Sequence, residues 1–459
     1  MADDIAEQDG IEEDVLDSRR MEAISEAVAT EDSGRLASLL APLHAADIAD
    51  LLEQIGRSER RDLLRLWPDG IDGDILSELD EGIREEIIDS LAPDVLADAV
   101  RELDTDDVVD ILEDLEEADQ DRILGALEAE DRVAVQQALS YPDYSAGRLM
   151  QREVVVAPVG WNVGQAIDYM RSTEGLPDQF YHVILVDDGM KPQGYVTLGR
   201  VLSSRRDVLL KDIEEESFRT IEATEPEADV AYIFNQYHLI SCPVVDENDR
   251  LVGAITIDDA MNVLDEEHEE DMLRMAGVGD EASLSDTIFE AAKGRAVWLF
   301  VNLLTAILAS SVIAEFTDSI NKLVALAVLM PIVASMGGNA GTQTMTVAVR
   351  ALATRDLTAQ NAFRVIRREA AVGAINGLVF GMLMAIIAGW WFGLPMLSLV
   401  IGIAMVLTLI SAAAGGILIP MGLQKLGVDP ALASGPFVTT VTDVVGFFAF
   451  LELASWILL

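Results

Sequence analysis

The 459-residue sequence contains little cysteine, histidine or lysine. Its single cysteine, Cys242, excludes a disulfide within the chain. With four histidines besides, we find no nucleophile–base set and no HExxH-like metal motif, so we expect that the protein is not an enzyme. The N-terminus, MADDIAEQDG, lacks the basic segment and apolar core that are typical of a secretory signal peptide.

Positive charge is also scarce, because 31 lysines and arginines face 80 acidic residues, for a net charge of −49. Such a chain repels phosphates, which excludes nucleic acid as a partner. Two interpretations of the acidity stay open. It is either an adaptation to a salty cytoplasm, which the small number of lysines favours, or it includes carboxylate clusters that bind divalent cations.

The charge is distributed unevenly along the chain. Residues 295–459 hold seven acids and eight bases, which leaves 73 acids and 23 bases in residues 1–294. The two parts therefore require different solvents, water for the first and lipid for the second.

Residues 295–459 contain five apolar stretches long enough to span a bilayer. They cover residues 296–314, 323–352, 370–391, 396–419 and 436–458. Basic residues gather in the segments that five spans would place on one side of the membrane. The positive-inside rule then predicts a multi-pass plasma-membrane protein with a cytoplasmic N-terminal region and its C-terminus outside.

A carboxylate interrupts the last apolar stretch at Asp443. An acid at this depth costs about 2.5–3.5 kcal/mol and therefore needs a role. It either hydrogen-bonds to Thr439 or Thr440, one turn earlier, or binds a cation in an aqueous pathway, which we favour. Glu452 lies nearer the outer end, as an exit-side acid or a hydrogen-bonding group within the bundle.

The second stretch contains glycines and amides, in the run Gly337-Gly-Asn-Ala-Gly-Thr-Gln343. This run predicts a broken helix that lines a water-filled cavity, or close packing of helices through small residues. Together with Asp443, its oxygens suit Mg²⁺, which retains much of its water. The candidate pore-lining residues are Gly338, Asn339, Thr342, Gln343, Thr439 and Thr440.

The first part of the chain divides by its periodicity. A motif such as Leu52-Glu-Gln-Ile55 recurs every 24 residues over 46–140, which predicts short helices stacked into a superhelical array. Beyond residue 150 the pattern predicts two βαββα modules. Their strands are expected at 154–156, 182–186, 195–197, 220–221, 242–246 and 251–256, and their helices at 163–171 and 229–237. An acidic helix over 258–273 and a second connecting helix over 284–294 should follow.

Several motifs occur in a characteristic order, at residues 44–49, 140–150, 243–246, 270–275, 337–343 and 429–443. In this order they resemble the MgtE family of magnesium channels and transporters over nearly the whole chain. The resemblance implies a homodimer in a lipid bilayer. It also implies an acidic N-terminal tail (1–35), an all-α helical-repeat N domain (36–146), two α/β CBS modules (147–209 and 210–264), a connecting "plug" helix (265–294) and a five-helix transmembrane pore domain (295–459).

The same resemblance implies a channel for Mg²⁺ that cytoplasmic Mg²⁺ closes, with the ion as both cargo and regulator. Asp443 matches the central cation site of the pore. The regulatory metal residues are Asp259, Glu267, Glu270 and Asp271. His238 and Asn262 stand where the family often has acids, so some sensor sites are expected to be weak or missing.

Residues 253–259 are similar to the ribose-binding pattern of CBS modules, which implies one adenine nucleotide, ATP, at Thr256 and Asp259. The first module has Arg200 instead of the acid. Ordinary strand-to-helix turns are the alternative explanation. Two rival functions also remain from the sequence: a secondary transporter coupled to Na⁺ or H⁺, and a membrane-tethered sensor that transports nothing.

Overall fold

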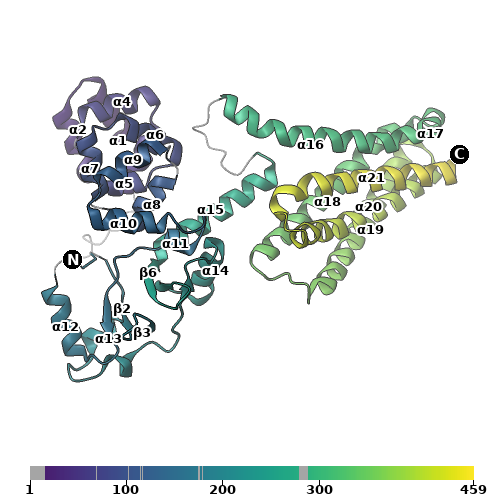
Figure 1. Cartoon of the computed structure of the whole chain (residues 1–459). Helices are drawn as coiled ribbons and strands as arrows, with labels where there is room; N and C mark the ends of the chain where they lie inside the picture. Colours follow the sequence, from purple (N-terminus) through teal and green to yellow (C-terminus); the bar gives the residue numbers. More distant parts are fainter. Residues whose placement is uncertain are drawn as a thin grey trace, which may run out of the picture. The chain divides into compact units, whose positions relative to one another are not determined.

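The computed structural model describes residues 16–68, 70–101, 103–113, 115, 117–173, 176–177, 179–278 and 288–459. The chain forms two compact units, residues 1–265 and 266–459 (Figure 1).

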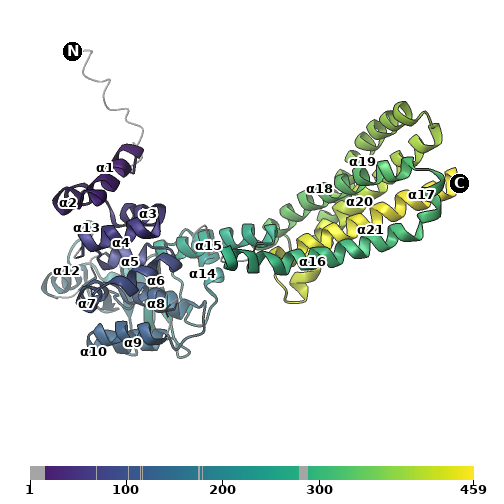
Figure 2. The same ribbon diagram turned by 90° about the horizontal axis from the view of Figure 1, so that it is seen from above.

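The first unit begins with short helices, as the 24-residue repeat predicts (Figure 2). Their bounds are α1 Ser18–Ala29, α2 Ser33–Leu40, α3 Ala45–Gln54, α4 Arg57–Leu66, α5 Gly73–Ser77, α6 Glu81–Ser90, α7 Pro93–Arg101, α8 Thr105–Glu113, α9 Glu117–Ala126 and α10 Ala129–Ala138. The leading apolar residues of the repeat, Leu52, Leu76 and Val100, are fully buried in one core, as is Leu112 at the half-period. The repeat therefore exists because each helix buries one apolar face against its neighbours.

Two buried arginines, 24 residues apart, join successive repeats. Arg60 donates from Nε to the carbonyl oxygen of Leu52 at 2.8 Å and pairs with Glu86 at 2.7 Å. Arg84 pairs in the same way with Asp110 at 2.7 Å. Each guanidinium thus satisfies groups at a helix end and also neutralises a carboxylate of the next repeat.

The two α/β modules follow, each with a three-stranded sheet (Figure 1). Their elements are α11 Ala146–Leu149, β1 Val156–Pro158, α12 Val163–Ser172, β2 His182–Val186, β3 Pro192–Thr197, α13 Leu198–Ser203, η1 Leu210–Ile213, β4 Ile221–Glu222, α14 Glu227–Tyr237, β5 Ser241–Val245 and β6 Leu251–Thr256. In each sheet the first strand is parallel to the second, and the second is antiparallel to the third. The strands at 182–186 and 251–256 match the sequence prediction residue for residue.

An acidic helix, α15 (Ile257–Ala276), precedes the membrane helices. These are α16 Ile288–Glu315, the short α17 Thr317–Lys322, α18 Ala325–Ala353, α19 Ala362–Phe392, α20 Pro395–Lys425 and α21 Pro430–Leu458. Among them, α16, α18, α19, α20 and α21 are long and apolar enough to cross a membrane, which confirms the five predicted spans. Within the described residues, the expected second connecting helix is the start of α16 and forms no separate element, while 284–287 lie outside them.

The glycine run does not break its helix, since α18 is continuous from Ala325 to Ala353. The glycines instead allow close approach. A Cβ at Gly337 would lie 2.7 Å from Cγ2 of Thr408 in α20, and one at Gly341 would lie 2.7 Å from Cγ1 of Val438 in α21. Of the two alternatives from the sequence, the structure therefore shows close helix contact through small residues.

Candidate functional site

Asp443 lies in the middle of α21 and is half-buried. The alternative of a local hydrogen bond is not what the structure shows. The Thr440 hydroxyl donates to the carbonyl oxygen of Pro436 at 2.6 Å, and the Thr442 hydroxyl donates to that of Thr439 at 2.9 Å. Within the described part of the chain the Asp443 carboxylate has no hydrogen-bond partner, which leaves it available for another ligand.

The residues on both sides of Asp443 fix its position. Thr442 is fully buried and packs against Gly337 and Gly341 of α18. At Gly446, one turn later, a Cβ would lie 3.3 Å from Cγ2 of Thr408. These close contacts hold α18, α20 and α21 side by side (Figure 2). Asp443 follows Thr442 directly, so it lies next to this contact region.

One face of α18 is polar and uncovered in the single chain. Its exposed residues are Ser335, Asn339, Thr342, Gln343 and Thr346. A Cβ at Gly338 would meet no atom within 4 Å, so this position faces open space. Lipid offers no hydrogen bonds, so a polar face at membrane depth requires water or another protein surface.

The predicted pore-lining residues differ in their exposure. Asn339, Thr342, Gln343 and Thr439 are exposed, whereas Gly338 and Thr440 are half-buried. Glu452, near the outer end of α21, is exposed.

In the second unit, a cluster of charges joins the end of α15 to the start of α21. Burial, and then repulsion from neighbouring carboxylates, raises the pKa of Glu267 and of Asp271. Asp429 is one of those neighbours and pairs with Arg274 at 3.2 Å. Arg274 also pairs with Glu270 at 2.8 Å. The predicted regulatory acids Glu267, Glu270 and Asp271 therefore lie together. Asp429, to which the sequence analysis gave no role, lies with them.

A second group of carboxylates forms within the first unit, where α8 meets the first turn of α15. Burial and the charge of Asp259 raise the pKa of Asp107 to about 7 and that of Asp106 well above its ordinary value. Burial raises the pKa of Asp259 to about 6, although the Thr256 hydroxyl donates to its Oδ2 at 2.5 Å. The Thr105 hydroxyl, which donates to Glu153 at 2.7 Å, holds the start of α8 in place.

Asp106 and Asp107 were not predicted. Acids in the first turn of a helix are ordinary, because they complement the helix dipole. In a chain with 80 acidic residues, nothing in the sequence separates these two from the others. Only the folded chain brings them near Asp259.

The donor chemistry of both clusters fits a hydrated hard cation. Among the described residues, no three Asp, Glu, His or Cys side chains converge on a ready-made metal site. Magnesium, however, keeps several waters and takes only one or two carboxylates directly. Burial raises the pKa values of these acids most, and a divalent cation would relieve the repulsion between carboxylates that adds to it.

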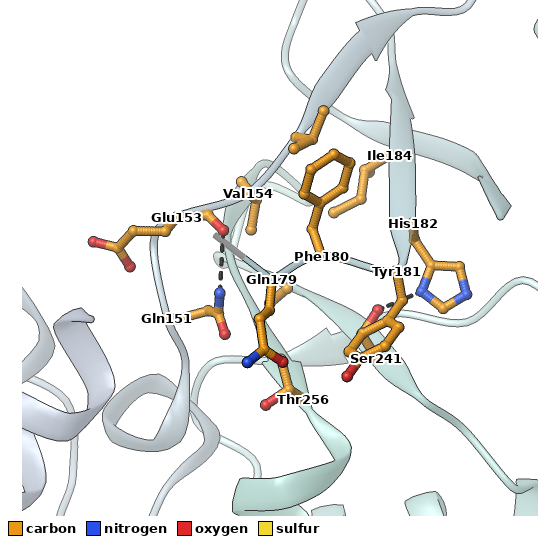
Figure 3. A pocket seen from close by; sticks show the side chains of 12 residues that line it. Gln151, Glu153, Val154, Gln179, Phe180, Tyr181, His182, Ile184, Ser241 and Thr256 are labelled. Atoms are coloured by element: carbon orange, nitrogen blue, oxygen red, sulfur yellow. Dashed lines mark hydrogen bonds between the residues drawn. The ribbon is translucent and has the colours of Figure 1, made fainter. Parts of the chain in front are cut away.

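A pocket lies between the two α/β modules (Figure 3). The space between its lining atoms is about 350 Å³, a volume that includes open solvent. Phe180, Tyr181 and Thr256 are among its lining residues. His182 Nδ1 lies 2.5 Å from the Ser241 hydroxyl across the modules, and burial lowers the pKa of His182. Of the two predicted nucleotide residues, Thr256 lines the pocket, whereas Asp259 does not line it but accepts a hydrogen bond from the Thr256 hydroxyl.

The two departures from the family pattern lie in ordinary local structure. His238 ends α14 with a left-handed backbone, at φ 53°, a conformation in which Asn, Asp and His are enriched. Asn262 is exposed on α15.

Comparisons with known proteins agree with this architecture. A family described as a divalent cation transporter matches residues 330–453, the MgtE intracellular N domain matches 43–144, and the CBS domain matches 146–207 and 210–266. The magnesium transporter MgtE of Enterococcus faecalis is 34% identical over 322 residues, which cover 70% of this chain and 71% of that protein. That of Thermus thermophilus is 31% identical over 330 residues, covering 71% and 72%.

Among solved structures, the cytosolic domain of the Mg²⁺ channel MgtE in complex with ATP is 25% identical, with a TM-score of 0.49. It covers 53% of this chain, and 99% of the solved chain is matched.

The fold and these matches define a membrane-embedded divalent cation transporter with an N domain and a CBS pair. The chain belongs to the MgtE family of magnesium transporters.

Proposed function

We propose that the protein is a passive Mg²⁺ channel whose pathway is lined by α18 and α21, with Asp443 as its central cation site. The observation that carries the proposal is a carboxylate without a hydrogen-bond partner in a membrane helix, beside an uncovered polar face. A membrane potential of 100 mV supplies about 4.6 kcal/mol for a divalent ion, twice the value for one charge, so no second coupling ion is needed.

A second copy of the chain completes the pathway in this proposal. The polar face of α18 is open in one chain, and lipid cannot satisfy it. In a homodimer the two faces would enclose water. The proposed orientation rests on Arg355 and on the arginines at the start of α19, because the positive-inside rule favours them on the cytoplasmic side. The N-terminal region would then be cytoplasmic and the C-terminus outside the plasma membrane.

Cytoplasmic Mg²⁺ closes the channel in the same proposal. The regulatory sites are the cluster around Asp259, with Asp106 and Asp107, and the cluster of Glu267, Glu270 and Asp271. Bare carboxylates repel one another, so the compact arrangement binds Mg²⁺ more tightly than the open one and is populated as Mg²⁺ rises. ATP is the proposed occupant of the pocket beside Thr256, where it would bias the same equilibrium.

Flux of Mg²⁺ into liposomes that contain the purified protein tests the function. Flux should require no Na⁺ or proton gradient and should fall as Mg²⁺ on the side of the soluble region rises. Flux that depends on a proton gradient would support a secondary transporter instead. An absence of flux at every Mg²⁺ concentration would favour the sensor.

A further inference from the structure

The first two turns of α19 carry a basic patch, which consists of Phe363, Arg364, Arg367 and Arg368. All four side chains are exposed, and Phe363 is 72% exposed. The Arg367 guanidinium lies 6.0 Å from the centre of the Phe363 ring, one helical turn away. The patch therefore presents three positive charges and one aromatic ring on a single short segment.

The backbone under the patch is firmly held. Val365 and Ile366 are half-buried and pack against a core that includes Leu357 and Ile417. The preceding loop is closed by Asn361, whose Oδ1 accepts a hydrogen bond from the backbone N–H of Thr358 at 2.9 Å. The arginines thus extend from a fixed support.

These arginines lack the carboxylate partners that others in the chain have. In the first unit, Arg60 and Arg84 each pair with an acid at 2.7 Å. Within the described residues, Arg364 and Arg367 form no ion pair, and Arg368 approaches only Glu369, at 3.9 Å. Three cations near the positive end of a helix dipole are also unfavourable without anions nearby. Within the second unit, this arrangement leaves positive charge available for an anion.

Helix length places the patch at the level of lipid headgroups. From Arg368 to the exposed Trp390 the helix advances by 22 residues, or about 33 Å at 1.5 Å per residue. This is close to the thickness of about 30 Å for the hydrocarbon core. With Trp390 at one interface, where tryptophan is enriched, the arginines lie at the other interface.

We propose that the α19 basic patch is a binding site for anionic phospholipid headgroups. Arginine forms paired hydrogen bonds with phosphate oxygens, and an exposed aromatic ring is favourable beside the headgroups. Basic clusters next to a membrane helix attract anionic lipid through the surface potential. This inference concerns lipid alone and does not depend on Mg²⁺ conduction.

Thermal unfolding of the full chain in neutral detergent tests the site, with dioctanoyl phosphatidylglycerol as the probe. The lipid should raise the unfolding midpoint in a saturable way, whereas dioctanoyl phosphatidylcholine and inorganic phosphate should not. In R364Q/R367Q/R368Q, the half-saturating concentration should rise about tenfold or more, because charge-assisted bonds are lost. The charge-retaining R364K/R367K/R368K should stay within about threefold, since lysine also binds phosphate.

The matched control removes three charges elsewhere. R35Q/R65Q/R205Q loses exposed, ion-paired arginines of the first unit and should bind the lipid as the native chain does. If the triple glutamine variant does not fold, R367Q alone should weaken binding by about threefold.

Three results would overturn the proposal. One is equal binding of phosphatidylglycerol by the native chain and the glutamine variant. Another is equal stabilisation by inorganic phosphate, which would indicate a free-anion site. The third is no response to lipid together with a less stable glutamine variant, which would assign the patch to carboxylates of the protein itself.

Discussion

Each of the two units is stabilised internally by a different kind of packing. In the first, large aliphatic side chains such as Leu52 and Leu76 are fully buried, and the buried Arg60 is neutralised by Glu86. In the second, α18 approaches α20 and α21 through Gly337 and Gly341. Water drives apolar burial in the first unit, whereas lipid is as apolar as leucine and leaves close contact as the main attraction between helices.

The units also differ in the partners that they provide for a charged side chain that is shielded from water. Arg60 has both a carboxylate and carbonyl oxygens as partners. Asp443 is half-buried with no hydrogen-bond partner among the described residues. Removing one partner of a buried charge pair destabilises the fold, whereas a charge without partners in the protein is available for a ligand.

Replacing Asp443 should have the largest effect on function. We expect Asp443→Asn to lower Mg²⁺ flux about 100-fold, because the attraction of the carboxylate for a partly desolvated ion is lost. Flux into liposomes measures it, and a monodisperse protein shows that the fold is intact. Glu452→Gln, on the same helix, is the control and should change flux by less than about twofold. Equal losses in both variants would contradict a central role for Asp443.

Replacing Arg60, a buried charge of the first unit, should affect the stability of the fold and not Mg²⁺ flux. Arg60→Met should destabilise that unit by about 1–3 kcal/mol, because the carbonyl oxygens of Leu52 and Ile55 lose their buried donor while Glu86 keeps only the exposed Arg57. Arg65→Met, on the same helix, removes an exposed ion pair and should cost about 0–1 kcal/mol. Hydrogen exchange of the amides in α3, α4 and α6 measures both changes. Similar protection in the two variants would show that the buried Arg60 contributes no more to stability than the exposed Arg65.

Neighbouring glycines of α18 test packing in the membrane unit. Gly337→Ala should cost about 1–3 kcal/mol, because the added Cβ would lie 2.7 Å from Thr408. Gly338→Ala adds the same atom where nothing lies within 4 Å, so its cost should be close to zero. The unfolding midpoints of the two variants in detergent measure this difference in stability. A Gly338 variant as unstable as the Gly337 variant would show that helix flexibility matters more than contact.

The smallest expected effect is the dependence of the α8 region on pH. The folded-state pKa of Asp107 is about 7, above its ordinary value of 3.8, so folding favours the protonated form. Stability from this group is therefore fully present below the ordinary pKa of 3.8 and is lost as pH rises from there to about 7. The part that is lost between pH 6 and pH 8 is about 1 kcal/mol.

Amide exchange in α8 between pH 6 and pH 8 measures this loss. Asp107→Asn should reduce the dependence and leave the part that is due to Asp106 and Asp259, and Mg²⁺ should reduce it in the native chain. A native profile that does not change with pH would mean that Asp107 is ionised without strain.

The sequence alone determined the elements that depend on local pattern. Apolar length fixed the five spans, because a helix needs about 20 residues to cross a bilayer. The 24-residue repeat predicted the helical array, and the spacing of apolar residues predicted the strands at 182–186 and 251–256. The motifs also identified the family, and Asp443 is a candidate site because a carboxylate is rare among apolar residues.

Tertiary structure alone decided which distant residues meet. Asp107 and Asp259 are about 150 positions apart in a chain full of acids, so no local pattern relates them. Asp429 joined the acids of α15 for the same reason. The glycine run was compatible with a broken helix and with close contact, and the side chains of α20 and α21 decided for contact. Local sequence sets length and period, whereas packing decides proximity, because it depends on every element at once.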